Sequence, residues 1–237
     1  MKRKITCFCD NAFDVEVPEQ IDLDSDSRYL DEILNGTFLN FTCPSCGKKH
    51  KPEFPLMILW PSKKLCFEVF PELERGEFYR RKKSPAGNSA EARTGVVSTK
   101  HNSPPVKSPY PVETVIGYPE MTDRLAIIRD GFDPAPVEAI KYFLQLKAEE
   151  QYPDDEPEIW YFRFNPGTAD ARGGQDSLEF HIHGIRKNEV AVMKVPLSLY
   201  QKTLEDYKKN PKSEVFSVLR VRSYLSVKNT MRPDELK

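Results

Sequence analysis

TCPSCGKKH, residues 42–50, contains two cysteines separated by two residues, and TCFCDNAF, residues 6–13, contains two separated by one. Zinc takes four ligands at tetrahedral corners, and thiolates two residues apart in a tight turn can reach one ion. Gly47 permits the positive φ at which a backbone folds around a metal. In an extended strand, Cys7 and Cys9 would share a face but stand two residues apart, so we expect a bend between them.

The two pairs together predict a structural zinc (Zn²⁺) site, whose four ligands would be Cys7, Cys9, Cys43 and Cys46. Four protein ligands close the coordination sphere and leave no water to activate, so the expected role is folding energy, not catalysis. Two alternatives stay open. One is a site that has lost its metal; the other is a dithiol redox pair, disfavoured because the strand-to-helix placement of a thioredoxin-like motif is absent. His50 is a lesser candidate ligand.

The composition excludes some classes of protein. The chain has 237 residues with 35 basic and 36 acidic side chains, so its net charge of −1 gives no overall drive toward nucleic acid or anionic lipid. No apolar stretch approaches the ~20 residues of a membrane span, and Asp10 precludes a signal-peptide core. We therefore expect a cytoplasmic protein. Disulfides are rare there, and Cys66 is predicted to be a buried strand residue.

The fold class predicted from the apolar periodicity is α+β. We expect an N-terminal zinc-ribbon-like small β-sheet with one helix, a flexible Pro/Ser-rich linker, a helical segment that completes the first part, and a C-terminal α+β region of unknown role. These segments are expected at residues 1–83, 84–111, 112–150 and 151–237. The linker is rich in proline and serine and has one aromatic residue, so it cannot bury enough apolar surface to offset chain entropy.

Several elements have specific signals. Residues 27–34 have apolar residues at helical spacing, and Asp133 before Pro134 opens a longer helix to about Glu150. The apolar stripe of that helix is predicted to include Val137, Ile140, Phe143, Leu144 and Leu146. The C-terminal region is predicted to contain an antiparallel sheet and a helix with a capping box at Ser198 and Gln201. The predicted strands are at 159–164, 178–185, 190–195 and within 215–227.

The chain resembles the bacterial CpXC domain family, named for its Cys-Pro-x-Cys elements. The resemblance is carried by TCFCDNAF, by residues 27–72 with CPSCG, and by GYPEMTDRLAIIRDGFDPAPVEAIKYFLQLKAE at 117–149. It covers roughly residues 1–150, with the linker as an insertion. The family pattern implies two Cys-x-x-Cys knuckles that hold one zinc, and only Cys43 and Cys46 match it without adjustment. The resemblance implies an architecture and no particular activity.

We therefore expect a non-enzymatic, zinc-binding protein that acts as a protein-interaction or regulatory module, with another protein as its partner. A second hypothesis is a nucleic-acid-binding regulator, because RGEFYRRKK, residues 75–83, ends in Arg80, Arg81, Lys82 and Lys83. The flanking glutamates make a solvated charge run the commoner explanation.

A third hypothesis is a metal-dependent enzyme. His181 and His183 alternate on a predicted strand, so both imidazoles would lie on one face, with Asp170 and Asp176 as conceivable partners. Two such histidines are more often an ordinary pair on a strand.

Overall fold

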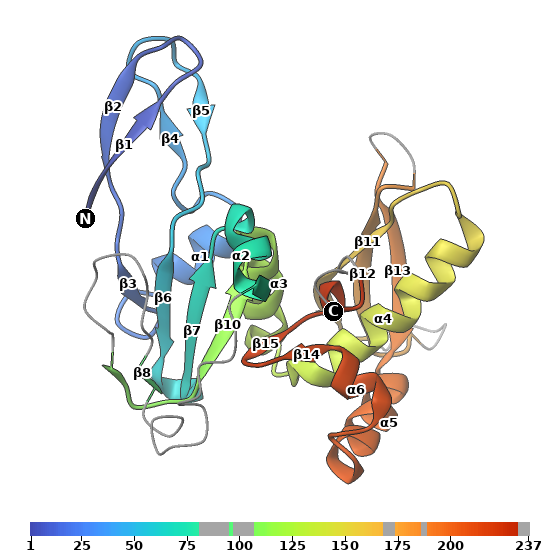
Figure 1. Ribbon diagram of the computed structural model, residues 1–237. Coiled ribbons are helices and arrows are strands. Elements are labelled where there is room, and N and C mark those ends of the chain that lie inside the picture. The colour runs from blue at the N-terminus through green and yellow to red at the C-terminus, as the bar shows by residue number, and fades with distance from the viewer. Residues whose placement is uncertain (81–94, 97–106, 168–173, 186–188, 232–237) are drawn as a thin grey trace. The chain divides into compact units, whose positions relative to one another are not determined.

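The α+β class is confirmed in the computed structural model, which describes residues 1–80, 95–96, 107–167, 174–185 and 189–231 (Figure 1). The chain forms two compact units, Met1–Thr122 and Asp123–Lys237, and the division falls inside helix α3 (Tyr118–Arg129). Most of the expected linker lies outside the described residues, and the segment boundaries expected from the sequence stay predictions. Within the described part of the chain, no helix has the length and apolar character needed to cross a membrane.

The first unit contains a mixed sheet in the strand order β10-β7-β6-β3. Strand β6 pairs antiparallel with β7, whereas β3 and β10 pair parallel with β6 and β7. These strands are β3 (Gln20–Asp22), β6 (Leu56–Trp60), β7 (Leu65–Phe70) and β10 (Val112–Ile116). Cys66 in β7 is fully buried, which confirms its prediction as a core residue. Strand β10 was not predicted, because its residues fall in the expected helical segment.

A separate ribbon, formed by two short strand pairs, carries the four cysteines of the predicted site. Strand β1 (Lys2–Thr6) pairs antiparallel with β2 (Ala12–Glu16), and β4 (Phe41–Thr42) pairs antiparallel with β5 (Lys49–His50). Its core is small: Ile5, Val15 and Val17 are buried, and the partly buried Phe13, Leu39, Phe41 and Phe54 pack against them. The small N-terminal strands expected from the sequence are present, and the structure divides them between this ribbon and the mixed sheet, with prolines at 52 and 55 between β5 and β6.

Helix α4 (Pro134–Gln151), which lies in the second unit, begins after Asp133 as predicted, since the Asp133 side chain accepts a hydrogen bond from the Ala135 N–H at 2.9 Å. The predicted apolar stripe is wrong in part. Phe143 and Leu146 are 48% and 44% exposed, whereas Lys141 is buried.

Two carboxylates explain the burial of Lys141. Its Nζ lies 2.9 Å from Asp123 Oδ2 and 2.8 Å from Glu138 Oε1, and both acids are buried as well. The second oxygen of each acid accepts a hydrogen bond from a backbone N–H group: Asp123 from Tyr161 and Glu138 from Val227. A buried charge that is paired and hydrogen-bonded can occupy a core position that the apolar pattern assigns elsewhere.

The second unit contains the predicted antiparallel sheet, in the order β11-β12-β13. Its strands are β11 (Glu158–Asn165), β12 (Ser177–His183) and β13 (Ala191–Pro196). At the β11 edge, the Tyr161 N–H donates to Asp123 Oδ1 and the Phe164 N–H donates to Asp130 Oδ2. These carboxylates satisfy edge donors that would otherwise be open to another strand.

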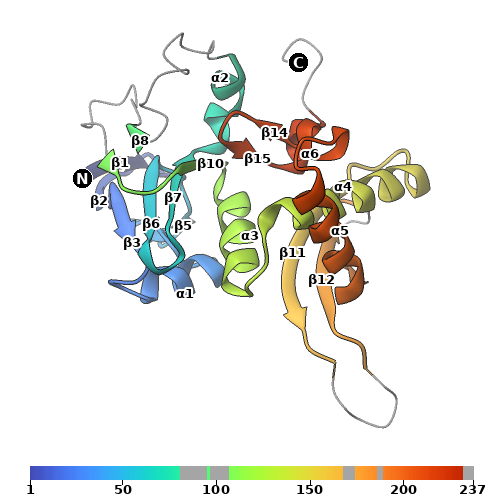
Figure 2. The same cartoon turned by 90° about the horizontal axis from the view of Figure 1, so that it is seen from below.

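The C-terminal part departs from prediction in two places. Helix α5 (Leu197–Lys209) begins one residue before Ser198 and shows no side-chain cap, so the capping box is not used. The strand predicted within 215–227 is instead a short helix, α6 (Glu214–Val218), followed by the hairpin of β14 (Arg220–Val221) and β15 (Tyr224–Leu225). Figures 1 and 2 show α6 beside α4, where Phe216 and Leu219 join Ala135 and Ala139 in one apolar cluster.

The remaining described elements are short. The first unit includes two short helices, of which α1 lies near its predicted position. It also includes two 3-10 turns and one two-stranded pair. A further 3-10 turn lies in the second unit. Their bounds are α1 (Arg28–Leu34), α2 (Arg75–Arg80), Pro61–Lys63, Glu72–Glu74, β8 (Gly95–Val96), β9 (Lys107–Ser108) and Val227–Asn229.

Candidate metal centre

The first cysteine pair lies in the turn between β1 and β2. The Cys7 N–H donates to the Asn11 carbonyl at 2.9 Å, and the Asp10 N–H donates to the Cys7 carbonyl at 3.0 Å. Asp10 has a φ of 62°, a left-handed conformation that aspartate tolerates better than most residues. This is the bend that the sequence required between Cys7 and Cys9, and it aims both thiols toward the second pair.

The second pair lies in the turn between β4 and β5. The Gly47 N–H donates to the Cys43 carbonyl at 2.9 Å, and the Cys43 N–H donates to the Lys48 carbonyl at the same distance. Gly47 has a φ of 73°, which only glycine adopts without a steric cost. Both turns lie at the end of the ribbon that Figure 1 shows farthest from the sheet of the first unit.

The four sulfur atoms of Cys7, Cys9, Cys43 and Cys46 all lie within 4.8 Å of one another. The Cys7–Cys46 Sγ distance is 3.5 Å and the Cys9–Cys43 Sγ distance is 3.8 Å, so each short distance joins the two turns. A tetrahedral zinc with bonds of about 2.3 Å has sulfur–sulfur edges of about 3.8 Å. The structure thus brings together all four cysteines of the predicted site, in a cluster that can hold a metal ion.

The thiol pKa values reflect this crowding. Burial raises the pKa of Cys43, but hydrogen bonds from the backbone N–H groups of Cys46 and Ser45 outweigh it and lower the pKa to about 6. Cys7 also receives a backbone hydrogen bond, from Cys9, that lowers its pKa. Burial and the neighbouring thiols dominate there and raise the pKa to about 12. Within the cluster, the pKa of Cys43 is therefore lowered and that of Cys7 is raised.

Two side chains surround the cluster. His50 Nε2 lies 3.1 Å from Cys7 Sγ, and Asn11 Nδ2 lies 3.8 Å from Cys43 Sγ. From the sequence, His50 is a lesser candidate ligand. The structure places it beside the cysteine cluster, where its ring N–H can donate a hydrogen bond to a thiolate. The sequence analysis missed Asn11, although its place two residues after Cys9 in a tight turn was a usable signal.

Phe8, between the two cysteines of the first pair, is 84% exposed. Its ring stacks on His50 with centroids 5.8 Å apart, and Lys48 Nζ lies 4.9 Å from the ring centroid. The cysteine turn therefore presents an aromatic ring to solvent, held by a neighbouring ring and a cation.

The other candidate sites from the sequence are less developed. Arg80 ends α2 and its Nε donates to the Gly76 carbonyl, whereas Arg81, Lys82 and Lys83 lie outside the described residues. The nucleic-acid hypothesis built on that cluster therefore stays a prediction.

His181 and His183 lie on one face of β12, with ring centroids 6.3 Å apart. His181 stacks on Phe162 at 4.0 Å, and burial and the neighbouring His183 lower its pKa. Asp176 accepts the Gly167 N–H, and Asp170 lies outside the described residues. Among the residues that the structure describes, the cysteine cluster is the one group of three or more potential metal ligands. The histidines thus show the arrangement of an ordinary pair on a strand.

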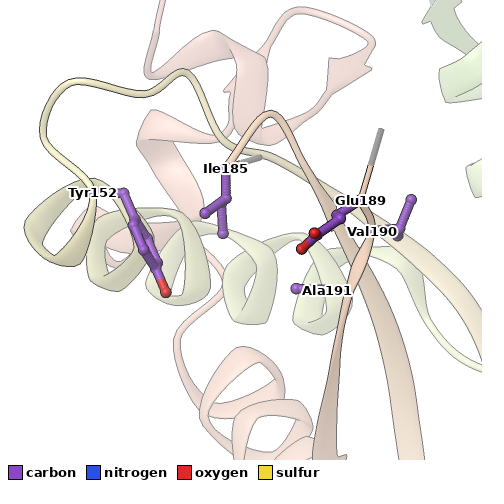
Figure 3. Close-up of a pocket in the computed structure, with 5 residues that line it drawn as sticks. All are labelled: Tyr152, Ile185, Glu189, Val190 and Ala191. Atoms are coloured by element: carbon purple, nitrogen blue, oxygen red, sulfur yellow. The ribbon is translucent and has the colours of Figure 1, made fainter. Parts of the chain in front are cut away.

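A small cavity lies near the start of β13. Figure 3 shows its lining of Tyr152, Ile185, Glu189, Val190 and Ala191, and its volume is about 140 Å³. Ligand sites usually occupy roughly 300–1,000 Å³ with several convergent polar groups. This cavity is smaller, and none of the predicted site residues lines it.

Comparison with known proteins agrees with the geometry. The CpXC protein family model matches residues 5–141. An uncharacterized protein of Treponema pallidum (strain Nichols) is 30% identical over 229 residues, which cover 95% of this chain and 97% of the relative. No solved structure matches the chain significantly. The match to the family model spans both cysteine pairs, α3 and the start of α4, and it shows that this chain belongs to the CpXC family.

Proposed function

We propose that Cys7, Cys9, Cys43 and Cys46 bind one zinc ion, which stabilises the ribbon of a non-enzymatic interaction module. The observation that carries the proposal is the set of sulfur–sulfur distances, all within 4.8 Å, with the two short ones close to a tetrahedral edge. Thiolate sets of this kind suit zinc better than magnesium or calcium, which prefer oxygen ligands. Four thiolates complete the coordination, so the role is structural.

Metal analysis of the purified protein tests the zinc site. We expect about one zinc per chain, lost on Cys43→Ser and retained on Cys66→Ser. Cys66 is a matched control because its thiol is also buried but lies in β7, outside the cluster. Less than about 0.2 zinc per chain, with all four thiols titratable in the native protein, would refute the proposal.

The interaction surface of the module is proposed to centre on Phe8, and its partner to be another protein. A ring that His50 and Lys48 already hold in place loses little freedom on binding, and exposed aromatic residues commonly anchor protein interfaces. Four thiolates around one Zn²⁺ leave a net negative charge, which is offset in part by Lys48 in the turn of Cys43 and Cys46.

A photo-crosslinking amino acid at position 8 tests the partner class in cells. We expect adducts that protease removes and nuclease leaves intact, and far fewer adducts when Cys43→Ser is added. Position 73 is the control, since Leu73 is 99% exposed in the same unit. Nuclease-sensitive adducts would favour the nucleic-acid hypothesis, and equal yields at both positions would contradict an interface at Phe8.

A further inference from the structure

The two edges of the β11-β12-β13 sheet differ. At β11, the carboxylates of Asp123 and Asp130 accept edge N–H groups. At β13, the only strand partner in the described part of the chain is β12, with a regular register from Ala191 to Pro196. Regular, unprotected edge strands are templates for pairing with another strand.

The outer strand also exposes an apolar run. Val190, Val192 and Met193 are 46%, 55% and 41% exposed, and Ala191 between them is exposed too. Four consecutive exposed apolar residues at a sheet edge are unusual in a strand that contacts only water. Val190 and Ala191 also help to line the small cavity of Figure 3, beside the start of this strand.

We propose that β13 pairs antiparallel with β13 of a second copy of this chain, around a twofold axis perpendicular to the sheet at Val192. Such an axis places Val192 opposite its own copy and Ala191 opposite Met193 of the second copy. Val190 then meets the aliphatic stem of Lys194, whose side chain is 63% exposed. Each of the five positions 190–194 then has a partner on its own side of the continuous sheet: 190, 192 and 194 on one face, 191 and 193 on the other. The contact is hydrophobic at its centre.

The neighbouring symmetric registers are worse. Centring the axis on Met193 would set Val190 opposite Pro196, which has no N–H to donate. Centring it on Ala191 would set Met193 opposite Glu189. The register at Val192 avoids both and keeps the two Lys194 charges apart, so the strand complements itself better than a shifted copy. This self-complementarity favours a second copy over an unrelated strand.

Sedimentation of the full chain at about 100 µM tests the proposal. We expect a species of about twice the 27.3 kDa chain mass. Because residue 192 faces itself, Val192→Lys and Val192→Glu each place like charges opposite one another, so each variant alone should weaken dimerisation at least about tenfold. An equimolar mixture of the two variants should restore a dimer, since the mixed pair sets Lys opposite Glu.

Two outcomes would overturn the proposal: a wild-type chain that stays monomeric, or single variants that dimerise as well as the wild type. Phe143→Lys is the matched control, because Phe143 is similarly exposed but lies on α4. Restored pairing in the mixture excludes misfolding as the cause of the loss. The proposal does not rest on metal binding, and Cys43→Ser should leave the dimer intact, so the two proposals fail separately.

Discussion

His50 shows how one residue can join the chemistry of the cysteine cluster to the surface of the protein. Its Nε2 lies 3.1 Å from Cys7 Sγ, while its ring stacks on the exposed Phe8 and meets the edge of Phe13. A hydrogen bond to a ligating thiolate delocalises its charge and fixes its orientation. The same imidazole is thus placed to support the proposed metal site and to hold the exposed ring.

His50→Ala is expected to weaken zinc retention by about tenfold to a hundredfold, as the loss of such supporting groups typically does. Competition with a chromophoric chelator measures this change. His183→Ala is the control, because His183 lies on β12 in the other unit and should leave zinc affinity unchanged. Equal retention by the two variants would show that the His50 contact is incidental.

Asp130 is a second residue whose role follows from its contacts. Burial raises its pKa, but hydrogen bonds from Arg129, the Tyr161 hydroxyl and the Phe164 N–H outweigh this and hold the pKa below its ordinary value of 3.8. The ionised carboxylate therefore stabilises the folded state at pH values above its ordinary pKa of 3.8. This stabilisation is lost as the pH falls through the lower pKa of the folded state.

Asp130→Asn should cost about 1.5–3 kcal/mol of unfolding free energy at pH 7, the usual worth of hydrogen bonds to a charged group. The difference from the parent should shrink as the pH falls below 3.8, because the parent loses the same charge there. Urea unfolding at several pH values measures it. Asp154→Asn, in an exposed turn, should have little effect at any pH. A deficit that is constant down to pH 2 would contradict an ionic role for Asp130.

At the scale of elements, the sequence predicted best where the signal was local. The N-cap at Asp133 and the strands of the β11-β12-β13 sheet follow from caps and alternation, and the structure has them. The cysteine cluster was equally local, because each pair lies in its own turn. Arg81, Lys82 and Lys83 of the nucleic-acid hypothesis, and Asp170 of the enzyme hypothesis, lie outside the described residues.

The elements predicted wrongly depend on contacts distant in sequence. Lys141 is buried because Asp123, 18 residues away, supplies its partner, and no helical periodicity encodes that. Strand β10 forms because β7, more than 40 residues earlier, offers a parallel edge. The strand predicted within 215–227 became α6 and a hairpin whose Phe216 and Leu225 pack on Ala139 of α4. Burial of this kind overrides local preference.

At the scale of the whole molecule, the two proposals belong to different units. The cysteine cluster lies in Met1–Thr122 and the proposed pairing strand β13 lies in Asp123–Lys237. A dimer through β13 would carry two ribbons, and two-site binding to one partner can exceed the affinity of a single site. Metal binding would then set whether each ribbon is folded, and dimerisation would set how many are presented together.

Removing zinc should therefore loosen the ribbon and spare the rest of the chain. The ribbon buries just Ile5, Val15 and Val17 in its own cluster, too small a core to stay folded without the metal. With a chelator, we expect hydrogen exchange to rise in residues 1–17 and 37–54 and to stay unchanged in β7, α4 and β12. Cys43→Ser without chelator should reproduce this pattern, while Cys66→Ser should not. An equal rise in both units would mean that the metal supports the whole fold, and no rise in residues 1–17 would mean that the ribbon is stable without it.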